Sequence, residues 1–474
     1  MAIRFYDSLT ASVQDLIPVT PGHIGMYFCG PTVQSEPHIG HLRSALIYDQ
    51  VRRWLSYRGF DVTVIRNVTD IDDKILALAT AQEPWWALAA RVERAFTAAY
   101  DRLNILPPTY TPHATAHIPQ MIELINRLIE GGHAYAATDG TGDVYFDAGS
   151  WPSYGELTRQ SLADMEPAAD GDPRGKRDPR DFALWKGNKA SEPEDASWPS
   201  PWGRGRPGWH IECSAMAVRY LGATFDIHGG GLDLRFPHHE NELAQSRAAG
   251  DGFARIWLHN GLVNVGGTKM SKSLGNFTLA SDLFAQASPI VVRYFLGAAH
   301  YRSTVEFDPE RSLGESEAAV ERILGFLERA ERKLSQTRYA ELLTAAPVPE
   351  AFADAMDDDL SVPVALAVLH DTVRQGNAAM DAEQWRNAGE SYGRVLGMLT
   401  VLGLNPRDYA ETPGAQSVEQ AALGELIDAR LSEREQARQA RDFARADHIR
   451  DELAAVGIQV EDTPAGPVWS INGK

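Results

Sequence analysis

The chain has 474 residues and a formal net charge of −19, and this length is typical of two or three domains with separate cores. Its 44% of hydrophobic and 23% of charged residues are ordinary for a globular protein. The acidic balance excludes a surface that binds nucleic acid without specificity, so a polyanion must meet a local basic patch. Because no apolar run approaches a membrane span and the N-terminal stretch lacks secretory-signal features, we expect a cytoplasmic protein with no membrane partner.

The first part of the chain has the pattern of an α/β fold. Residues 23–29 and 61–68 predict two buried strands, and residues 38–59 between them predict an amphipathic helix that ends at Gly59. A strand, a long helix and a parallel strand form the unit of a doubly wound sheet. A helical stretch is expected next, over residues 85–132.

The pattern changes twice along the rest of the chain. Residues 165–208 are rich in proline, glycine and charge, which predicts a long surface excursion. Beyond residue 312 the apolar residues recur at helical spacing, and residues 403–417 have the composition of a linker. The predicted domains are residues 1–311 with an insertion over roughly 105–208, residues 312–402, and residues 418–474.

The stretch FPHHENE, residues 236–242, concentrates groups that can bind a metal ion. His238 and Glu242 are four residues apart, so on a helix they share one face. Pro237 suits the first turn of such a helix. The metalloprotease pattern H-E-x-x-H is excluded because its second histidine would fall on Leu243.

The only two cysteines of the chain, Cys29 and Cys213, are distant in sequence. In a cytosolic setting a disulfide is not expected, which leaves buried thiols or metal ligands. Two thiols, one imidazole and one carboxylate would make a reasonable zinc shell. Spacing alone does not show that the four groups converge, so unrelated core cysteines and solvated charges at a helix start are the alternative.

Two further stretches are suited to phosphate groups. His38 and His41 lie at the junction between a predicted strand and the start of a predicted helix, where backbone N–H groups bind phosphate and imidazoles can donate hydrogen bonds. Lys269 and Lys272 occupy a loop flanked by glycines, an arrangement that suits a polyphosphate whose charge shifts during reaction. The alternatives are two surface histidines and an ordinary basic turn.

The order of these stretches resembles a known family. HIGH at 38–41 followed by KMSKS at 269–273 resembles the signatures of class I aminoacyl-tRNA synthetases. Further stretches, among them MYFCGPTV, RNVTDIDDKI, DFALWK and GGGLDLRFPHHENE, are similar to the cysteinyl-tRNA synthetase family, and the resemblance runs from about Phe5 to the C-terminus. It implies a Rossmann-like parallel-sheet catalytic domain with an inserted subdomain, an all-α helical bundle and a small C-terminal anticodon-binding domain.

The resemblance implies a two-step reaction. L-Cysteine and ATP, the latter with Mg²⁺, give cysteinyl-adenylate and pyrophosphate, and the acyl group then passes to the 3′ end of tRNA-Cys. One zinc ion is implied to select the substrate as its thiolate, because zinc deprotonates a bound thiol and bonds it at about 2.3 Å, which the hydroxyl of serine does not match. The implied zinc ligands are Cys29, Cys213, His238 and Glu242.

The resemblance also implies the remaining site residues. The implied catalytic and ATP-binding residues are His38, His41, Lys269 and Lys272, with Ser271 as a further ATP contact. The implied cysteinyl-adenylate pocket comprises Thr32, Asn67, Thr69, Trp209 and Asp233. The alternative for Trp209 is that it packs in the core as an aromatic side chain beside the helix that carries a metal ligand, without contacting substrate.

The C-terminal stretch carries a candidate tRNA surface. Its arginines, at steps of four, four, three and four, are Arg430, Arg434, Arg438, Arg441 and Arg445. One continuous helix would align them as a stripe for phosphates, and Asp442 marks a candidate break in it. A solvated helix laced with salt bridges is the alternative. Trp469, in a predicted terminal hairpin, could stack on an anticodon base.

Two rival functions remain in view. A related cysteine ligase of mycothiol synthesis passes cysteine to an amino-sugar, but such relatives lack the C-terminal segments and this chain keeps Glu242. A non-catalytic, regulatory synthetase-like protein would be indicated by loss of His38, His41, Lys269 or Lys272, and none is lost. The resemblance implies a monomer, because bacterial relatives are commonly monomeric, and no heptad pattern contradicts this expectation.

Overall fold

The chain forms two compact units, residues 1–409 and 410–474, which are considered separately. The computed structural model describes residues 2–165, 175–266, 268–269, 277–409, 418–440, 442–463 and 466–471. Among these residues, no helix has both the length and the apolar character needed to span a membrane.

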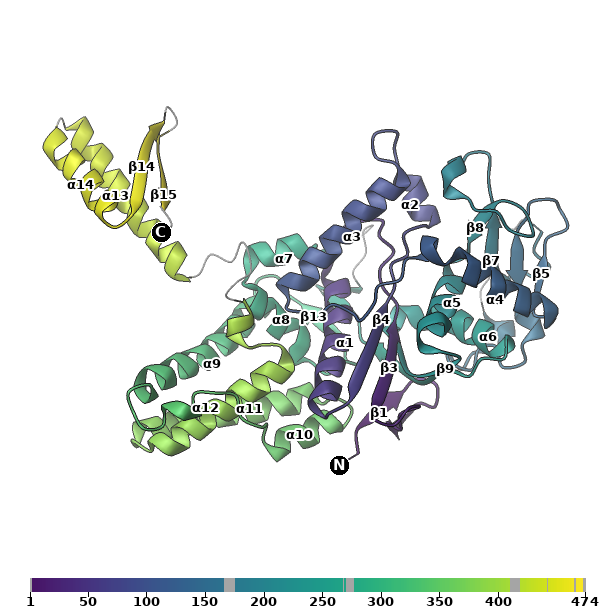
Figure 1. The fold of residues 1–474 in the computed structure, drawn as a ribbon, viewed down its shortest axis with the longest axis horizontal. Helices are drawn as coiled ribbons and strands as arrows, with labels where there is room; N and C mark the ends of the chain where they lie inside the picture. Colours follow the sequence, from purple (N-terminus) through teal and green to yellow (C-terminus); the bar gives the residue numbers. More distant parts are fainter. Residues whose placement is uncertain are drawn as a thin grey trace. The chain divides into compact units, whose positions relative to one another are not determined.

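A four-stranded parallel sheet forms the centre of the larger unit, in the order β10-β9-β3-β4. The strands are β3 (His23–Phe28), β4 (Asp61–Arg66), β9 (Thr224–Gly231) and β10 (Phe253–Asn260), and α1 (Ile39–Tyr57) connects β3 to β4. The predicted strand, helix and parallel strand are therefore confirmed (Figure 1). Because the chain leaves β3 towards β4 on one side and later returns to β9 on the other, the carboxyl end of β3 is a topological switch point, where ligands bind in such sheets.

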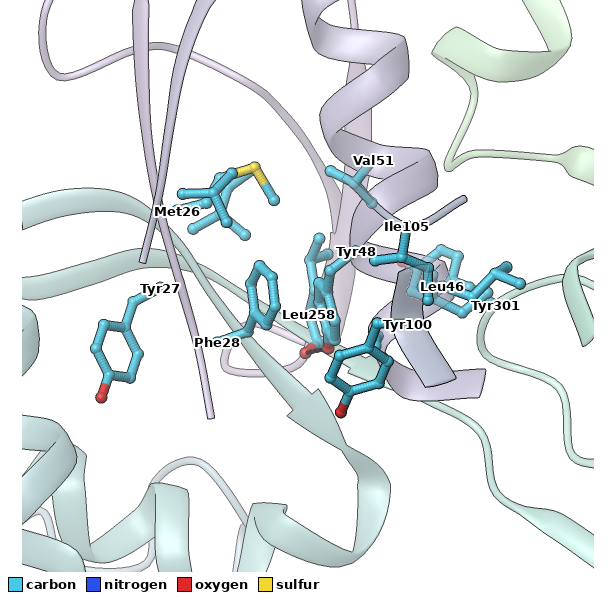
Figure 2. Packing of buried hydrophobic residues seen from close by; sticks show 14 of the residues in the cluster. Met26, Tyr27, Phe28, Leu46, Tyr48, Val51, Tyr100, Ile105, Leu258 and Tyr301 are labelled. Atoms are coloured by element: carbon cyan, nitrogen blue, oxygen red, sulfur yellow. Dashed lines mark hydrogen bonds between the residues drawn. The ribbon is translucent and has the colours of Figure 1, made fainter. Parts of the chain in front are cut away.

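The first turn of α1 is stabilised by its own histidines. The His38 ring accepts a hydrogen bond from the N–H of Gly40 at 3.1 Å, and the His41 ring accepts one from the N–H of His38 at 3.3 Å. Further along, the ring of Tyr48 stacks on Phe28 of β3, with 4.8 Å between centroids (Figure 2). Full burial of each such side chain contributes on the order of 2 kcal/mol, so α1 is anchored both by its cap and by the sheet.

An inserted region separates β4 from β9. Its helices are α2 (Asp73–Leu78), α3 (Trp85–Arg102) and α4 (Ile118–Glu130), and α5 (Trp209–Leu221) leads back to the sheet. Its antiparallel sheet consists of β5 (Ala134–Ala136), β6 (Val144–Phe146), β7 (Phe182–Gly187) and β8 (Gly205–Pro207). The prediction of one surface excursion over 165–208 is wrong for β7 and β8, which belong to this sheet. Leu184 and Trp185, neighbours on β7, are both fully buried, so the strand lacks the polar-apolar alternation that would have indicated it in the sequence.

The chain from residue 312 to residue 402 is mainly helical, as predicted. The helices are α9 (Ser312–Leu334), α10 (Glu350–Asp357), α11 (Val362–Asp381) and α12 (Trp385–Leu402). The remaining elements of the larger unit are β1 (Arg4–Asp7), β2 (Ser12–Asp15), α6 (Glu240–Ala248), β11 (Val263–Val265), β12 (Thr268–Lys269), α7 (Ala280–Gln286), α8 (Pro289–Ala298) and β13 (Val305–Phe307).

A buried arginine joins the helical region to the sheet domain. Arg293 of α8 forms an ion pair with Asp49 of α1, and both side chains are 1% exposed. The same guanidinium donates to the carbonyls of Leu103, at 2.7 Å, and Leu402, at 3.0 Å. The helix that carries HIGH and the end of α12 are therefore held by one cation.

The smaller unit consists of α13 (Val418–Gln439), α14 (Phe443–Ala455) and a hairpin of β14 (Ile458–Thr463) and β15 (Gly466–Ile471). Asp442 caps α14 by accepting a hydrogen bond from the N–H of Arg445 at 3.1 Å. The arginines therefore do not lie on one continuous helix. The core of this unit consists of Ile427, Leu431, Ile449, Leu453 and Ile458.

Candidate active site and metal centre

Four groups that are far apart in sequence converge beside the carboxyl end of β3. Cys29 follows that strand and Cys213 lies on α5. His238 lies just before α6, and Glu242 lies in its first turn. The sulfur atoms of the two cysteines are 3.7 Å apart, Cys29 Sγ is 3.4 Å from Glu242 Oε1, and His238 Nε2 is 3.1 Å from the same oxygen. All four ligand atoms lie within 4.8 Å of one another.

The spacing and chemistry of this cluster fit a tetrahedral zinc ion. Tetrahedral bonds of about 2.3 Å to sulfur place two sulfurs about 3.8 Å apart, close to the separation of Cys29 and Cys213. Burial raises the pKa of both thiols and lowers the pKa of His238. Without a cation, burial therefore favours neutral groups here, and a bound cation would favour the thiolates that act as ligands.

A second set of donors shares two members with the first. His228 and His239 lie close enough to Cys29 and Glu242 to form an alternative four-ligand cluster. However, His228 Nε2 is already 2.8 Å from Glu242 Oε2, and its ring stacks on Trp257 at 4.5 Å. This hydrogen bond is the one expected of a residue that orients a ligand carboxylate.

Buried histidines surround the cluster, and the sequence analysis did not single them out as a group. His210 Nδ1 lies 2.9 Å from His238 Nδ1, and His239 Nδ1 lies 2.8 Å from His259 Nε2. Burial lowers the pKa of His210 and of His259 to about 3, so both rings are neutral at pH 7. Three of these histidines lie in the stretches WHIEC, DIHGGG and LHN. These stretches are far apart in sequence, so only the folded structure shows that the rings are neighbours.

A cavity of about 390 Å³ opens beside the four candidate metal ligands. Of the residues predicted for the site, those that line it are Cys29, Thr32, His38, His41, Trp209 and Asp233. The ring of Trp209 stacks on His238, with 4.1 Å between centroids, so this aromatic contacts both the cluster and the cavity. The structure thus brings the HIGH histidines and the candidate metal ligands to one space.

The two HIGH histidines lie against one another at the start of α1. Their rings stack with 3.6 Å between centroids. Because both Nδ1 atoms accept backbone hydrogen bonds, the ring protons of neutral His38 and His41 belong on Nε2. Each ring can therefore donate a hydrogen bond from Nε2 to an oxygen of a ligand.

Asn67 and Thr69 lie behind the cavity wall, each 1% exposed. Asn67 Oδ1 accepts a hydrogen bond from the N–H of Gly30 at 2.8 Å, and Thr69 Oγ1 donates to Glu212 Oε2 at 2.8 Å. A Cβ on Gly30 would lie 1.6 Å from the carbonyl oxygen of Asn67, so only glycine fits there. These contacts shape the cavity, and the predicted contact of Asn67 and Thr69 with substrate stays a prediction.

The KMSKS stretch is described only in part. The backbone of Lys269 pairs with Asn264 in the β11–β12 ladder. Ser271 and Lys272 lie outside the described residues, so their predicted contacts with ATP stay predictions. Cavity-lining residues with polar side chains that the sequence analysis did not name are Gln34, Ser44, Arg66, Lys74, Tyr100 and Asn260.

The predicted tRNA residues are spread over the smaller unit. Arg434 is 6% exposed. Arg445 forms an ion pair with Glu433, which also lies 2.6 Å from Arg430. The network of ion pairs considered above is therefore present around Glu433. Trp469 Nε1 donates to Asp428 at 3.1 Å, Arg438 lies on α13, and Arg441 lies outside the described residues.

Three family models match successive parts of the chain. The model of the catalytic domain of class I tRNA synthetases (C) matches residues 15–317. A DALR domain matches residues 351–404, and the anticodon-binding domain of cysteinyl-tRNA ligase matches residues 420–469.

Known proteins are similar over the whole length. The cysteine–tRNA ligase of Clavibacter michiganensis subsp. michiganensis is 62% identical over 486 residues, covering 100% of both chains. That of Leifsonia xyli subsp. xyli is 62% identical over 477 residues, covering 99% of this chain and 100% of the relative.

Solved structures share the fold. Methionyl-tRNA synthetase of Mycobacterium tuberculosis in complex with methionyl-adenylate is 16% identical, with a TM-score of 0.57 over 86% of this chain and 94% of that one. LeuRS of Agrobacterium radiobacter K84, in a ternary complex with tRNA and LeuAMS, is 11% identical with a TM-score of 0.60 over 86% and 87%.

Proposed function

The chain belongs to the cysteine–tRNA ligase family, a family of ligase enzymes, and we propose that it joins L-cysteine to tRNA-Cys in two steps. Cysteine and ATP first give cysteinyl-adenylate and pyrophosphate, and the acyl group then passes to the terminal adenosine of the tRNA. One observation carries this proposal: the cysteine-containing metal cluster and the HIGH histidines border the same cavity.

We propose that Cys29, Cys213, His238 and Glu242 hold one zinc ion. When bound, zinc would supply a soft Lewis acid that favours the thiolate of a substrate cysteine over the hydroxyl of serine. Cys29 contributes to the cavity lining, so the ligand set borders the space where a substrate side chain would lie. Trp209 covers His238 and narrows this end of the cavity for a small side chain.

The other end of the substrate needs groups that bind an ammonium. Asp233 and Thr32 line the cavity and supply a carboxylate and a hydroxyl. A carboxylate and an ammonium form a charge-assisted hydrogen bond, the stronger kind. We propose that these two side chains orient cysteine so that its carboxylate faces the HIGH histidines.

His38 and His41 are proposed to bind the ATP phosphates. Their Nε2–H groups are donors, and they lie at the first turn of α1, where the helix dipole also favours anions. Charge that develops on the α-phosphate during attack by the substrate carboxylate is stabilised by such fixed donors. Lys269, Lys272 and Ser271 are proposed to bind the departing pyrophosphate, and Mg²⁺ is proposed to accompany ATP.

The smaller unit is proposed to bind the anticodon region of tRNA-Cys. Its match to an anticodon-binding domain supports this role, and it disfavours the rival cysteine ligase of mycothiol synthesis, whose relatives lack such a segment. Arg438, Arg441 and Trp469 stay candidate contacts. The expected monomeric state and cytoplasmic location also stay predictions.

The proposed first step is tested by ATP–pyrophosphate exchange with the full, zinc-loaded chain and without tRNA. Cysteine should support exchange and serine should not. Exchange with neither amino acid, from folded protein that contains zinc, would exclude the adenylate step and favour a regulatory, non-catalytic role. Equal exchange with both would exclude selection through the metal.

A further inference from the structure

Arg66 is a cation in the cavity wall that begins the stretch RNVTDIDDKI and that has no role assigned above. It ends β4 and pairs with Phe28 of β3 in the sheet. Its Cγ lies 3.3 Å from where a Cβ on Gly30 would be, so its stem packs next to the residue that follows Cys29. Its guanidinium lies 4.4 Å from the centre of the Tyr100 ring, and both side chains line the cavity.

Two other arginines near α1 show what a satisfied buried guanidinium looks like in this fold. Arg43 donates to four carbonyl oxygens, at 2.6–3.3 Å. Arg293 pairs with Asp49 and also donates to carbonyls. Each therefore has partners that replace the water lost on burial, as buried charges require.

Arg66 differs from both. Within the part of the chain that the structure describes, no carboxylate lies within 4.0 Å of its guanidinium, and the face of Tyr100 is its only close partner. Burial lowers the pKa of Arg66, and the nearby Asp49 and Asp101 offset this only in part. A partly buried fork of five N–H donors in the cavity wall matches the oxygens of a phosphate.

We propose that Arg66 binds a phosphate group of the 3′ end of the tRNA during acyl transfer. This inference rests on the proposed function and deepens its second step. β4 is the edge strand on the far side of β3 from β9, the glycine-rich strand that ends in the cavity wall. Lys74, exposed on α2, is a second cation that lines the cavity. Arg66 and Lys74, here called the basic track, are therefore two cations of the cavity lining that suit a phosphodiester chain entering from solvent.

The same phosphate chemistry could come from ATP, and the experiment separates the two sources. Arg66→Met keeps the aliphatic stem and removes the charge, and Arg66→Lys restores the charge. Arg102→Met is the matched control, because Arg102 also lies over an aromatic ring, Phe284 at 4.1 Å, but does not line the cavity. Lys74→Gln alters an exposed side chain, so it tests the track without a risk to folding.

Each variant is assayed for ATP–pyrophosphate exchange without tRNA and for aminoacylation over a range of tRNA-Cys concentrations. We expect Arg66→Met to lower kcat/KM for tRNA by about 10- to 100-fold, as expected for lost charge-assisted bonds, with exchange unchanged. Arg66→Lys should recover part of the loss, Lys74→Gln should show a smaller loss, and Arg102→Met should show none. Loss of one phosphate contact should also reduce the salt-dependence slope of tRNA binding by about 0.7–0.9.

A binding assay makes the test independent of catalysis. An acceptor-stem RNA hairpin ending in CCA, and the same hairpin without CCA, are titrated against the wild-type chain and Arg66→Met by fluorescence anisotropy. We expect Arg66→Met to weaken binding of the first RNA only. Equal loss of exchange and transfer would assign Arg66 to ATP and overturn the proposal, as would unchanged tRNA kinetics and binding. A wild-type chain that binds the RNA through Arg66 but gives no exchange would refute the proposed function alone.

Discussion

His228 Nε2 lies 2.8 Å from Glu242 Oε2, and both side chains are fully buried. Glu242 Oε1 faces Cys29 and His238. One oxygen of the carboxylate therefore faces the other candidate metal ligands, and the second is bonded to His228. The position of the carboxylate is therefore determined by a residue that is not itself in the ligand set proposed here.

Removing this support should weaken metal binding. We expect His228→Gln to lower zinc affinity by about 10- to 100-fold, the usual effect of losing a partner that orients a ligand, as measured by competition with a chromophoric chelator. His259→Gln is the matched control, because His259 is a buried ring bonded to His239 at 2.8 Å but not to any of the four proposed ligands. Equal zinc affinity in wild type and His228→Gln would contradict the orienting role.

The cluster should hold a single zinc ion that also stabilises the fold. Cys213→Ser should abolish the stoichiometric zinc found by elemental analysis, since the hydroxyl is a poor replacement for a thiolate. Because a ligand bound only to the folded state raises stability, chelation should lower the Tm of the wild type but not that of the variant. His23→Gln, at a partly exposed histidine at the opposite end of β3 from Cys29, should leave both measurements unchanged.

The pair of Asp49 and Arg293 should contribute strongly to stability. Burial raises the pKa of Asp49, but the charges of Arg293 and Arg53 reverse this effect and hold its pKa below the ordinary value. Asp49→Asn should therefore lower the free energy of unfolding by about 3–5 kcal/mol, because a buried guanidinium loses its counter-charge. Denaturant titration measures this loss.

A second variant separates pairing from packing at this site. Asp49→Leu combined with Arg293→Met removes both charges and should be more stable than Asp49→Asn alone. A double variant that is less stable than the single one would show that the carbonyl contacts of Arg293, and not its charge pair, dominate.

Asp73 should make stability depend on acid pH. Burial raises its pKa, but Lys186 and Arg206 outweigh this and lower the pKa to about 2. The folded-state pKa is depressed, so the stabilisation is complete above the unfolded value near 4 and is lost as pH falls towards 2. Because the Asp73 side chain is 48% exposed, we expect Asp73→Asn to reduce stability by only about 1 kcal/mol at pH 7.

The pH dependence of that difference is the measurement. The gap in unfolding free energy between wild type and Asp73→Asn should shrink between about pH 4 and pH 2. Glu194→Gln, a surface acid of the same inserted region, serves as control. A gap that stays constant over this range would show that Asp73 acts through hydrogen bonds alone.

Local patterns in the sequence were sufficient to predict the type of each helix and strand next to the HIGH motif. The apolar run of β3, the capped amphipathic helix α1 and the alternating β4 are each encoded within a few neighbouring residues, so their type was predictable. The strand β7 was missed because Leu184 and Trp185 are buried on opposite faces, and such a strand shows no alternation.

The sequence proposed the members of the candidate site, whereas their arrangement came only from the tertiary structure. The resemblance supplied Cys29, Cys213, His238 and Glu242, while spacing alone left an unrelated pair of thiols open. Asn67 and Thr69 belong to a matching motif, yet their side chains lie behind the cavity wall, each 1% exposed. Arg66 begins the stretch RNVTDIDDKI, yet the stretch alone assigns it no role, since an unpaired guanidinium is recognised only when its surroundings are known.

The sequence by itself determined the family, the order of the domains and the residue types that are available for metal and phosphate binding, because these depend on motifs and short-range periodicity. Only the tertiary structure decided that the two sulfurs, 184 residues apart in sequence, lie 3.7 Å from one another, and that Asp442 divides the arginine stripe. Contacts of this kind arise from the packing of whole elements against one another, and no local pattern encodes that packing.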